Sequence, residues 1–144
     1  MYLKNYIFLF CLVCLNLSGF AQKSEVTKQP IVIGESVTFP SKILKQDRIL
    51  NIYLPESYTK EKAGNYPVIY LLDGSMDEDF IHIAGLVQFG SFSWIQMVPE
   101  SIVVGISNID RKHDLTFPTK NKKDKEEFPT TGGSEDFINF IEKE

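Results

Sequence analysis

Two short, uninterrupted apolar runs constrain this chain more than any other feature. The first is Pro67–Leu72, which ends at Asp73-Gly74, and the second lies within residues 101–107, SIVVGIS. Runs of this length without polar alternation are typical of strands buried on both faces, as in a parallel or mixed sheet covered by helices. Asp-Gly marks a turn at the end of the first run. The sequence therefore predicts a covered central sheet.

An antiparallel hairpin is predicted ahead of these strands. Residues 30–43 and 48–54 each alternate apolar and polar side chains, and a polar break at 45–47 separates them. Two alternating segments joined by a short polar turn indicate a hairpin. Pro40 favours the edge of the sheet for the first of them.

Helical spacing follows each apolar run. Residues 79–97 begin as a helix, but Gly90 and later residues suggest that the second half is a separate turn. Ser134 is predicted to cap a helix over 134–144, and residues 108–131 are predicted to form a long polar loop. A hairpin followed by alternating strands and helices predicts an α/β fold with three layers.

Composition excludes several functional classes. The 144 residues are 43% hydrophobic with a net charge of −4, which is typical of one globular domain and argues against nucleic-acid binding. The only cysteines, Cys11 and Cys14, are too few for a disulfide scaffold or a zinc site. We predict no metal.

The first 21 residues are typical of a secretory signal peptide. Lys4 precedes an apolar stretch over 6–15, and small residues lead to Ala21. The stretch is short for a bilayer span, which takes about 20 residues. The alternative is a membrane anchor that is never cut. We expect cleavage after Ala21, export to the periplasm or extracellular space, no stable membrane insertion, and a mature region over 22–144.

Polar and glycine residues follow the first buried strand, where ligands bind in open α/β sheets. Backbone N–H groups in the loop Gly74-Ser75-Met76 are candidates to stabilise an oxyanion. The alternative is a simple turn in which Asp73 ties down its own loop. The acidic residues of this region lack the spacing of a calcium loop.

A second set, over 108–114, follows the other buried strand and is expected to face the same crevice. Arg111 is a candidate to clamp an anionic or carbonyl-bearing substrate. Asp114 is expected to bind its own loop or cap Thr116. His113 is a weaker candidate for a general base, because a histidine between Lys and Asp on a loop is usually solvated.

No nucleophile elbow, G-x-S-x-G, is present. The segment 105–109 offers Gly105 and Ser107 but has Ile109 where the second glycine belongs. The two histidines are His82 and His113, and His82 falls on the predicted helix. The sequence therefore offers no credible Ser-His-acid triad.

Taken together, these segments resemble a known family. YPVIYLLDG, PESIVVGISN, the R-x-x-D-L-T-x-P-T pattern from Arg111 to Thr119, and GGSEDFINFIEKE occur in the order found in the N-terminal half of esterase D-like α/β hydrolases. The enterochelin- and siderophore-esterase-like branch is the most similar. LNIYLPESY also fits that family, and the resemblance covers most of residues 36–144.

The resemblance implies a serine carboxylic-ester hydrolase that acts on a small-molecule ester and needs no cofactor. By position, Gly74, Ser75 and Met76 resemble the oxyanion-hole loop, Arg111 an arginine of the substrate cleft, and Asp114 a residue that holds its loop. In the family the nucleophile, the acid and the histidine come later. We therefore expect a partial α/β-hydrolase sandwich, truncated before the elbow, that is inactive alone.

Two other functions stay open at this stage. One is a non-catalytic module that holds a ligand with the Arg111 loop and with Phe89, Phe92 and Trp94. Those aromatics otherwise belong to a core or flap helix. The other is a carbohydrate esterase that removes acetyl or feruloyl groups.

Overall fold

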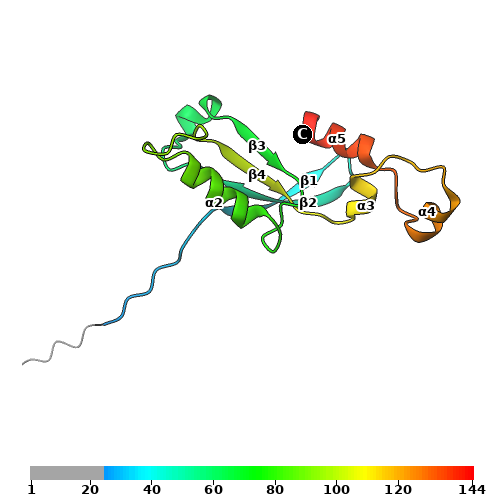
Figure 1. Cartoon of the computed structure of the whole chain (residues 1–144), viewed down its shortest axis with the longest axis horizontal. Coiled ribbons are helices and arrows are strands. Elements are labelled where there is room, and N and C mark those ends of the chain that lie inside the picture. Colours follow the sequence, from blue (N-terminus) through cyan, green and yellow to red (C-terminus); the bar gives the residue numbers. More distant parts are fainter. Residues whose placement is uncertain (1–24) are drawn as a thin grey trace, which may run out of the picture. The chain divides into compact units, whose positions relative to one another are not determined.

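A four-stranded mixed sheet forms the centre of residues 32–144 (Figure 1). The computed structural model describes residues 25–144, so the predicted signal peptide lies outside the described residues. Residues 25–31 form no regular secondary structure. Among the residues described, no helix combines the length and the apolar character that crossing a bilayer requires.

The strands are β1 (Glu35–Ser41), β2 (Gln46–Tyr53), β3 (Val68–Leu71) and β4 (Ile102–Ile106). Their order is β1-β2-β4-β3, in which β1–β2 and β2–β4 are antiparallel and β3–β4 are parallel. The predicted hairpin and mixed sheet are confirmed. Because β3 and β4 run in the same direction, the loops that follow them meet at one edge of the sheet.

The helical elements are η1 (Lys60–Asn65), α2 (Phe80–Gly90), α3 (Arg111–Asp114), α4 (Lys122–Glu127) and α5 (Ser134–Lys143). The prediction of a continuous loop over 108–131 was wrong, since the segment contains α3 and α4. The side chains of Asp110 and Asn121 cap these short helices by accepting backbone N–H bonds. Ser134 is the first residue of α5 and not its cap, a position that Gly133 occupies.

Two apolar clusters lie on opposite faces of the sheet. On one face, Tyr53 and Val103 pack against α2. On the other, Leu50 and Ile106 pack against α5. Alternate residues of a strand point to opposite faces, so the alternating positions of β2 and β4 divide between these clusters. Helix, sheet and helix therefore form three layers, which confirms the predicted α/β class.

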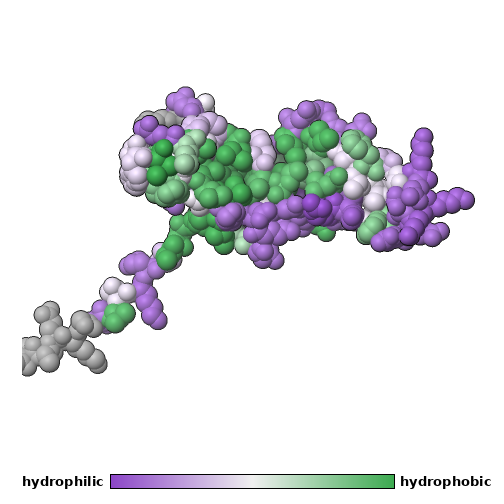
Figure 2. Space-filling view, viewed as in Figure 1, coloured by the Kyte–Doolittle hydropathy of each residue, from purple (hydrophilic) through white to green (hydrophobic). Residues whose placement is uncertain are grey.

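The prediction that both apolar runs are buried on two faces holds for β4 but was wrong for β3. Val103 and Ile106 are buried, whereas Val68 and Tyr70 are 44% and 54% exposed. Among the described residues β3 pairs only with β4, and the cluster under α5 draws its strand residues from β1, β2 and β4. Figure 2 shows apolar surface over the region of β3, β4 and α2.

Candidate active site

The loop after β3 is held from the side by residues that follow β4. Arg111 donates from Nε to Oδ1 of Asp73 at 2.8 Å and from a terminal nitrogen to Oδ2 at 3.0 Å, and Asn108 donates to Oδ1 at 2.7 Å. The hydrogen bonds from Arg111, and then from Asn108, lower the pKa of the Asp73 carboxyl. The same ion pair raises the pKa of Arg111. The two sets predicted from sequence therefore meet at one edge of the sheet.

Asp73 holds a left-handed backbone conformation, with φ of 55°. Side chains rarely adopt this region, although aspartate tolerates it better than most. The turn it makes lets Asp79 donate its N–H to the Asp73 carbonyl at 3.2 Å. The loop is therefore a defined turn whose carboxylate faces the side chains of Asn108 and Arg111.

Gly74 sits directly against β4. Its N–H donates to the Ile106 carbonyl at 3.0 Å, and its carbonyl accepts from the buried Asn51 amide at 2.8 Å. A Cβ at Gly74 would lie 2.6 Å from the Ile106 nitrogen, so only glycine fits. Because the Gly74 N–H is already bonded, it is not an available oxyanion donor, and the predicted loop loses that candidate.

Ser75 and Met76 remain candidate donors. The Ser75 N–H makes only a long contact, 3.4 Å, with the Glu78 carboxylate, and the Ser75 carbonyl accepts from the Glu78 N–H at 3.1 Å. Within residues 25–144, the Met76 N–H has no hydrogen-bond partner. The loop thus presents backbone N–H groups at the edge of the sheet where substrates bind in this fold class. Their role as an oxyanion hole stays a prediction.

Beneath α3 lies a buried ionic network. Arg48 of β2, fully buried, donates to Asp114 Oδ2 at 2.7 Å, and the other oxygen of Asp114 lies 2.9 Å from Nδ1 of His113. Arg48 also lies over the Phe137 ring, 5.5 Å from its centroid. Asp114 therefore connects α3 to the sheet, and it does not cap Thr116, whose hydroxyl bonds the Lys112 carbonyl.

His113 shares this network, but it is no part of a triad in the described chain. Its ring is 43% exposed and packs beside Gly133, where a Cβ would collide with it. Between residues 25 and 144, no serine hydroxyl is hydrogen-bonded to His82 or His113. No group of three His, Cys, Asp or Glu in that range is arranged to hold a metal ion.

Sequence reasoning missed three polar residues that build the site. Asn51 supports Gly74, Asn108 orients Asp73, and Arg48 anchors Asp114. Arg48 and Asn51 carry a signal, because each is a polar residue within a strand that otherwise alternates apolar side chains, and both are buried. Asn108 lies within the second predicted set, but its sequence context does not indicate its partner.

The layered sheet and the loop at its carboxyl edge define part of an α/β-hydrolase fold. A family model named Esterase, with the description “Putative esterase”, matches residues 41–144. The chain belongs to this esterase family.

Comparisons with individual proteins lead to the same family. The chain is 30% identical over 111 residues to the ferri-bacillibactin esterase BesA of Bacillus subtilis. It is similar in structure to an IroE-like serine hydrolase from Shewanella oneidensis, with TM-score 0.60, 34% identity and 76% of this chain covered. The BES protein from Bacillus cereus gives TM-score 0.63 at 28% identity over 85% of this chain.

The chain spans less than half of each of these relatives. It corresponds to 38% of the length of BesA, 35% of the Shewanella chain and 48% of the Bacillus cereus chain. The matched part of this chain contains the Asp73 loop and the segment with Arg111, but no G-x-S-x-G motif.

Proposed function

We propose that this chain contributes the oxyanion-loop side of a serine carboxylic-ester hydrolase whose substrate is a siderophore ester. The family and the relative named as a ferri-bacillibactin esterase support this substrate class. The observation that carries the proposal is the Asp73 turn. Arg111 and Asn108 fix that turn so that the N–H groups of Ser75 and Met76 stand at the carboxyl edge of β3.

In the proposed reaction, a serine attacks the ester carbonyl while a histidine accepts the serine proton. The Ser75 and Met76 N–H groups stabilise the negative charge that develops on the carbonyl oxygen. Arg111 plays a positioning role through Asp73, and it remains a proposed contact for an anionic substrate. We propose that the nucleophile, its acid and its histidine lie outside residues 1–144, and that the protein is exported.

The first test is an assay of the 144-residue chain alone. We expect p-nitrophenyl acetate turnover no higher than that of a boiled control, because oxyanion donors without a nucleophile leave only residual catalysis. Turnover well above the control would refute the placement of the nucleophile outside this chain. Sequencing the gene past codon 144 is an independent test of the same proposal, since we expect a G-x-S-x-G motif and a later histidine there.

The second test restores the missing part. Residues 25–144 are fused to the remainder of the Shewanella hydrolase, and hydrolysis of a ferric catecholate siderophore ester is followed by mass spectrometry. Met76→Pro removes one candidate N–H at a turn position that accepts proline, and Met76→Ala keeps it. Loss of one oxyanion donor costs about 10²–10³ in kcat, so equal rates for the two variants would exclude Met76 as a donor.

A further inference from the structure

A cavity of about 450 Å³ lies at the opposite edge of the sheet from the Asp73 loop. Tyr53 ends β2 and Glu100 precedes β4, and Tyr53 pairs with Val103 near the start of β4. The remaining lining comes from the end of α2, the turn after it and the loop after β2. The cavity is therefore separate from the proposed site of ester hydrolysis.

One wall of this cavity is aromatic. The rings of Phe92 and Trp94 stack with centroids 4.6 Å apart and an angle of 22° between their planes. The turn that carries them is tied to α2, because Met97 donates its N–H to the Gly90 carbonyl at 2.8 Å and Ile95 donates to the Phe92 carbonyl at 2.8 Å. Trp94 is 74% exposed, so an aromatic face is available to a ligand.

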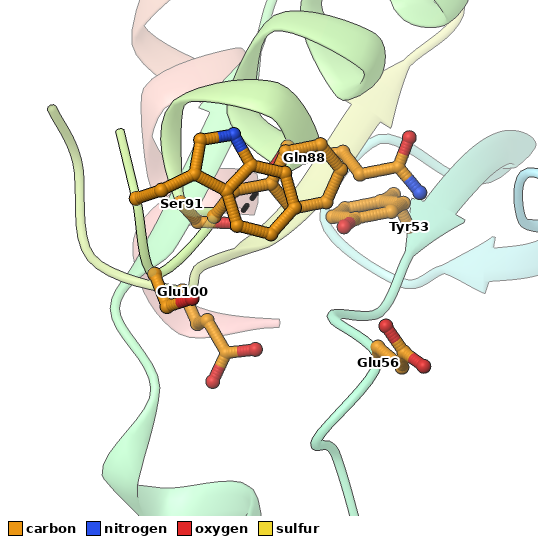
Figure 3. A pocket seen from close by; sticks show the side chains of 8 residues that line it. Tyr53, Glu56, Gln88, Ser91 and Glu100 are labelled. Carbon is orange, nitrogen blue, oxygen red and sulfur yellow. Dashed lines mark hydrogen bonds between the residues drawn. The ribbon is translucent and has the colours of Figure 1, made fainter. Parts of the chain in front are cut away.

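The opposite wall carries two carboxylates. Glu56 and Glu100 both line the cavity, and the lining contains no Lys, Arg or His among the residues that the structure describes. The Ser57 hydroxyl donates to one oxygen of Glu100, and the Tyr66 hydroxyl donates to the Ser57 carbonyl at 2.8 Å. Glu100 is thus oriented by its neighbours without being neutralised by a cation. Figure 3 shows both carboxylates on the same side of the cavity.

Tyr53 adds a polar group to the lining. The residue as a whole is only 5% exposed, and no hydrogen bond to its hydroxyl is found in the described part of the chain. Figure 3 shows the Tyr53 ring alongside the Gln88 side chain, with its hydroxyl end turned into the cavity and away from the Gln88 amide group. Burial, and then the charges of Glu100 and Glu56, raise the pKa of Tyr53. The cavity therefore disfavours additional negative charge.

We propose that this cavity is a binding site for an alkylammonium cation, held between the Phe92–Trp94 stack and the carboxylates of Glu56 and Glu100. An aromatic face attracts an organic cation through its quadrupole, and the attraction grows when the site is partly desolvated. The two carboxylates supply charge. The Tyr53 hydroxyl accepts a hydrogen bond from a ligand that carries an N–H group, as a polyamine or a lysine side chain does, whereas a quaternary ammonium such as choline binds through the charge and aromatic contacts alone. A ligand with this chemistry is a free polyamine or choline-like molecule, or a lysine side chain of a peptide.

Trp94 is the only tryptophan of the sequence, so its fluorescence reports on this cavity directly. The purified full chain is titrated with choline, with spermidine and with Nα-acetyl-lysine amide, whose side-chain ammonium group is free. The uncharged isostere of choline, 3,3-dimethylbutan-1-ol, and Mg²⁺ serve as comparison probes. We expect a saturable change with at least one ammonium probe that weakens as salt is added. No response to any ammonium probe, or an equal response to the neutral alcohol or to Mg²⁺, would overturn the proposal.

Matched variants test the assigned residues by calorimetry. Glu100→Gln and Glu56→Gln each remove one charge at constant size, and we expect each to weaken binding about fivefold or more. Trp94→Ala is expected to cost about 2- to 30-fold. Glu127→Gln, on the exposed helix α4, removes the same charge elsewhere and is expected to change nothing. Equal affinity for Glu100→Gln and Glu127→Gln would refute the site.

The ammonium probes distinguish the two ligand sources, since preference for the lysine amide indicates a peptide and preference for choline or spermidine a free cation. The measurement does not depend on ester hydrolysis. Binding of an ammonium probe without a catalytic serine beyond residue 144 would support this inference and refute the proposed enzyme function. Ester hydrolysis by the chimera without ammonium binding would refute this inference and support the proposed function.

Discussion

Two Arg–Asp pairs join the sheet to its edge loops, and they differ in almost everything except chemistry. Arg48 and Asp114 are 0% and 1% exposed, whereas Arg111 and Asp73 are 59% and 30% exposed. The nitrogen–oxygen distances are 2.7 Å and 2.8 Å, so geometry alone does not separate them. Burial does, because a buried charge without its partner is costly while an exposed one is solvated by water.

The largest expected effect is on the buried pair. Arg48→Met leaves the Asp114 carboxylate buried without its cation, which costs about 3–5 kcal/mol of the free energy of unfolding. The remaining contact, His113, offers only a partly exposed ring. Urea unfolding followed by circular dichroism measures the loss.

The double variant Arg48→Met, Asp114→Leu sharpens this result. Replacing both charges by apolar side chains is often close to neutral, so part of the loss should be recovered. A double variant as unstable as Arg48→Met would show that the side-chain shapes, and not the unpaired charge, determine stability here.

Backbone fit, and not the exposed ion pair, is expected to hold the Asp73 loop in place. A Cβ on Gly105 would lie 2.6 Å from the Gly74 carbonyl oxygen and 2.8 Å from the Phe80 ring. Gly105→Ala is therefore expected to cost about 1–3 kcal/mol. Thermal unfolding of the variant measures the loss.

Gly85→Ala is the matched control. Gly85 lies inside α2 with nothing within 4 Å of its would-be Cβ, so the substitution should stabilise by about 0.5–1 kcal/mol through helix propensity. If the two alanines shift stability in the same direction, the close approach of β4 to the loop does not control stability.

Sequence patterns were sufficient for the strands of the sheet and for the meeting of the two polar segments at one edge, because both follow from local periodicity and from the direction of the buried strands. The apolar run Val68–Leu71 and the alternation in Gln46–Tyr53 indicate strands whatever their neighbours are. The exposure of β3 was missed, because an apolar run gives no information on how many strands and helices cover it. Val68 and Tyr70 are exposed, and neither belongs to the apolar cluster that packs under α5.

The hydrogen-bond partners within the site could not be predicted in the same way. The expectation that Arg111 contacts a substrate does not indicate that its side chain bonds Asp73, 38 residues earlier in the chain. The sequence likewise does not indicate that the Gly74 N–H bonds Ile106 of β4. Both hydrogen bonds depend on the exact positions of single atoms in three dimensions, which local sequence patterns do not encode.

Asp73→Asn tests the exposed pair with a smaller expected effect. At about pH 6 the substitution should cost about 0.2–1 kcal/mol, the usual range for an exposed ion pair. The pKa of Asp73 is lowered below its ordinary value of 3.8 in the folded protein. Its contribution is therefore present above that value and is lost as the pH falls through the folded pKa. The stability difference between the two proteins should shrink in acid, and a difference that grows there would contradict the ion pair.

Arg111→Lys should have the smallest effect, because lysine keeps the charge and loses the two-pronged contact with Asp73. We expect a change of a few tenths of a kcal/mol in unfolding free energy, within the range of exposed pairs. The chimera gives a separate readout. If the two-pronged contact positions the loop, the Arg111→Lys chimera should hydrolyse esters with a lower kcat, while KM stays near its original value. A change in KM alone would instead make Arg111 a substrate contact, which separates the two roles that the exposed pair leaves open.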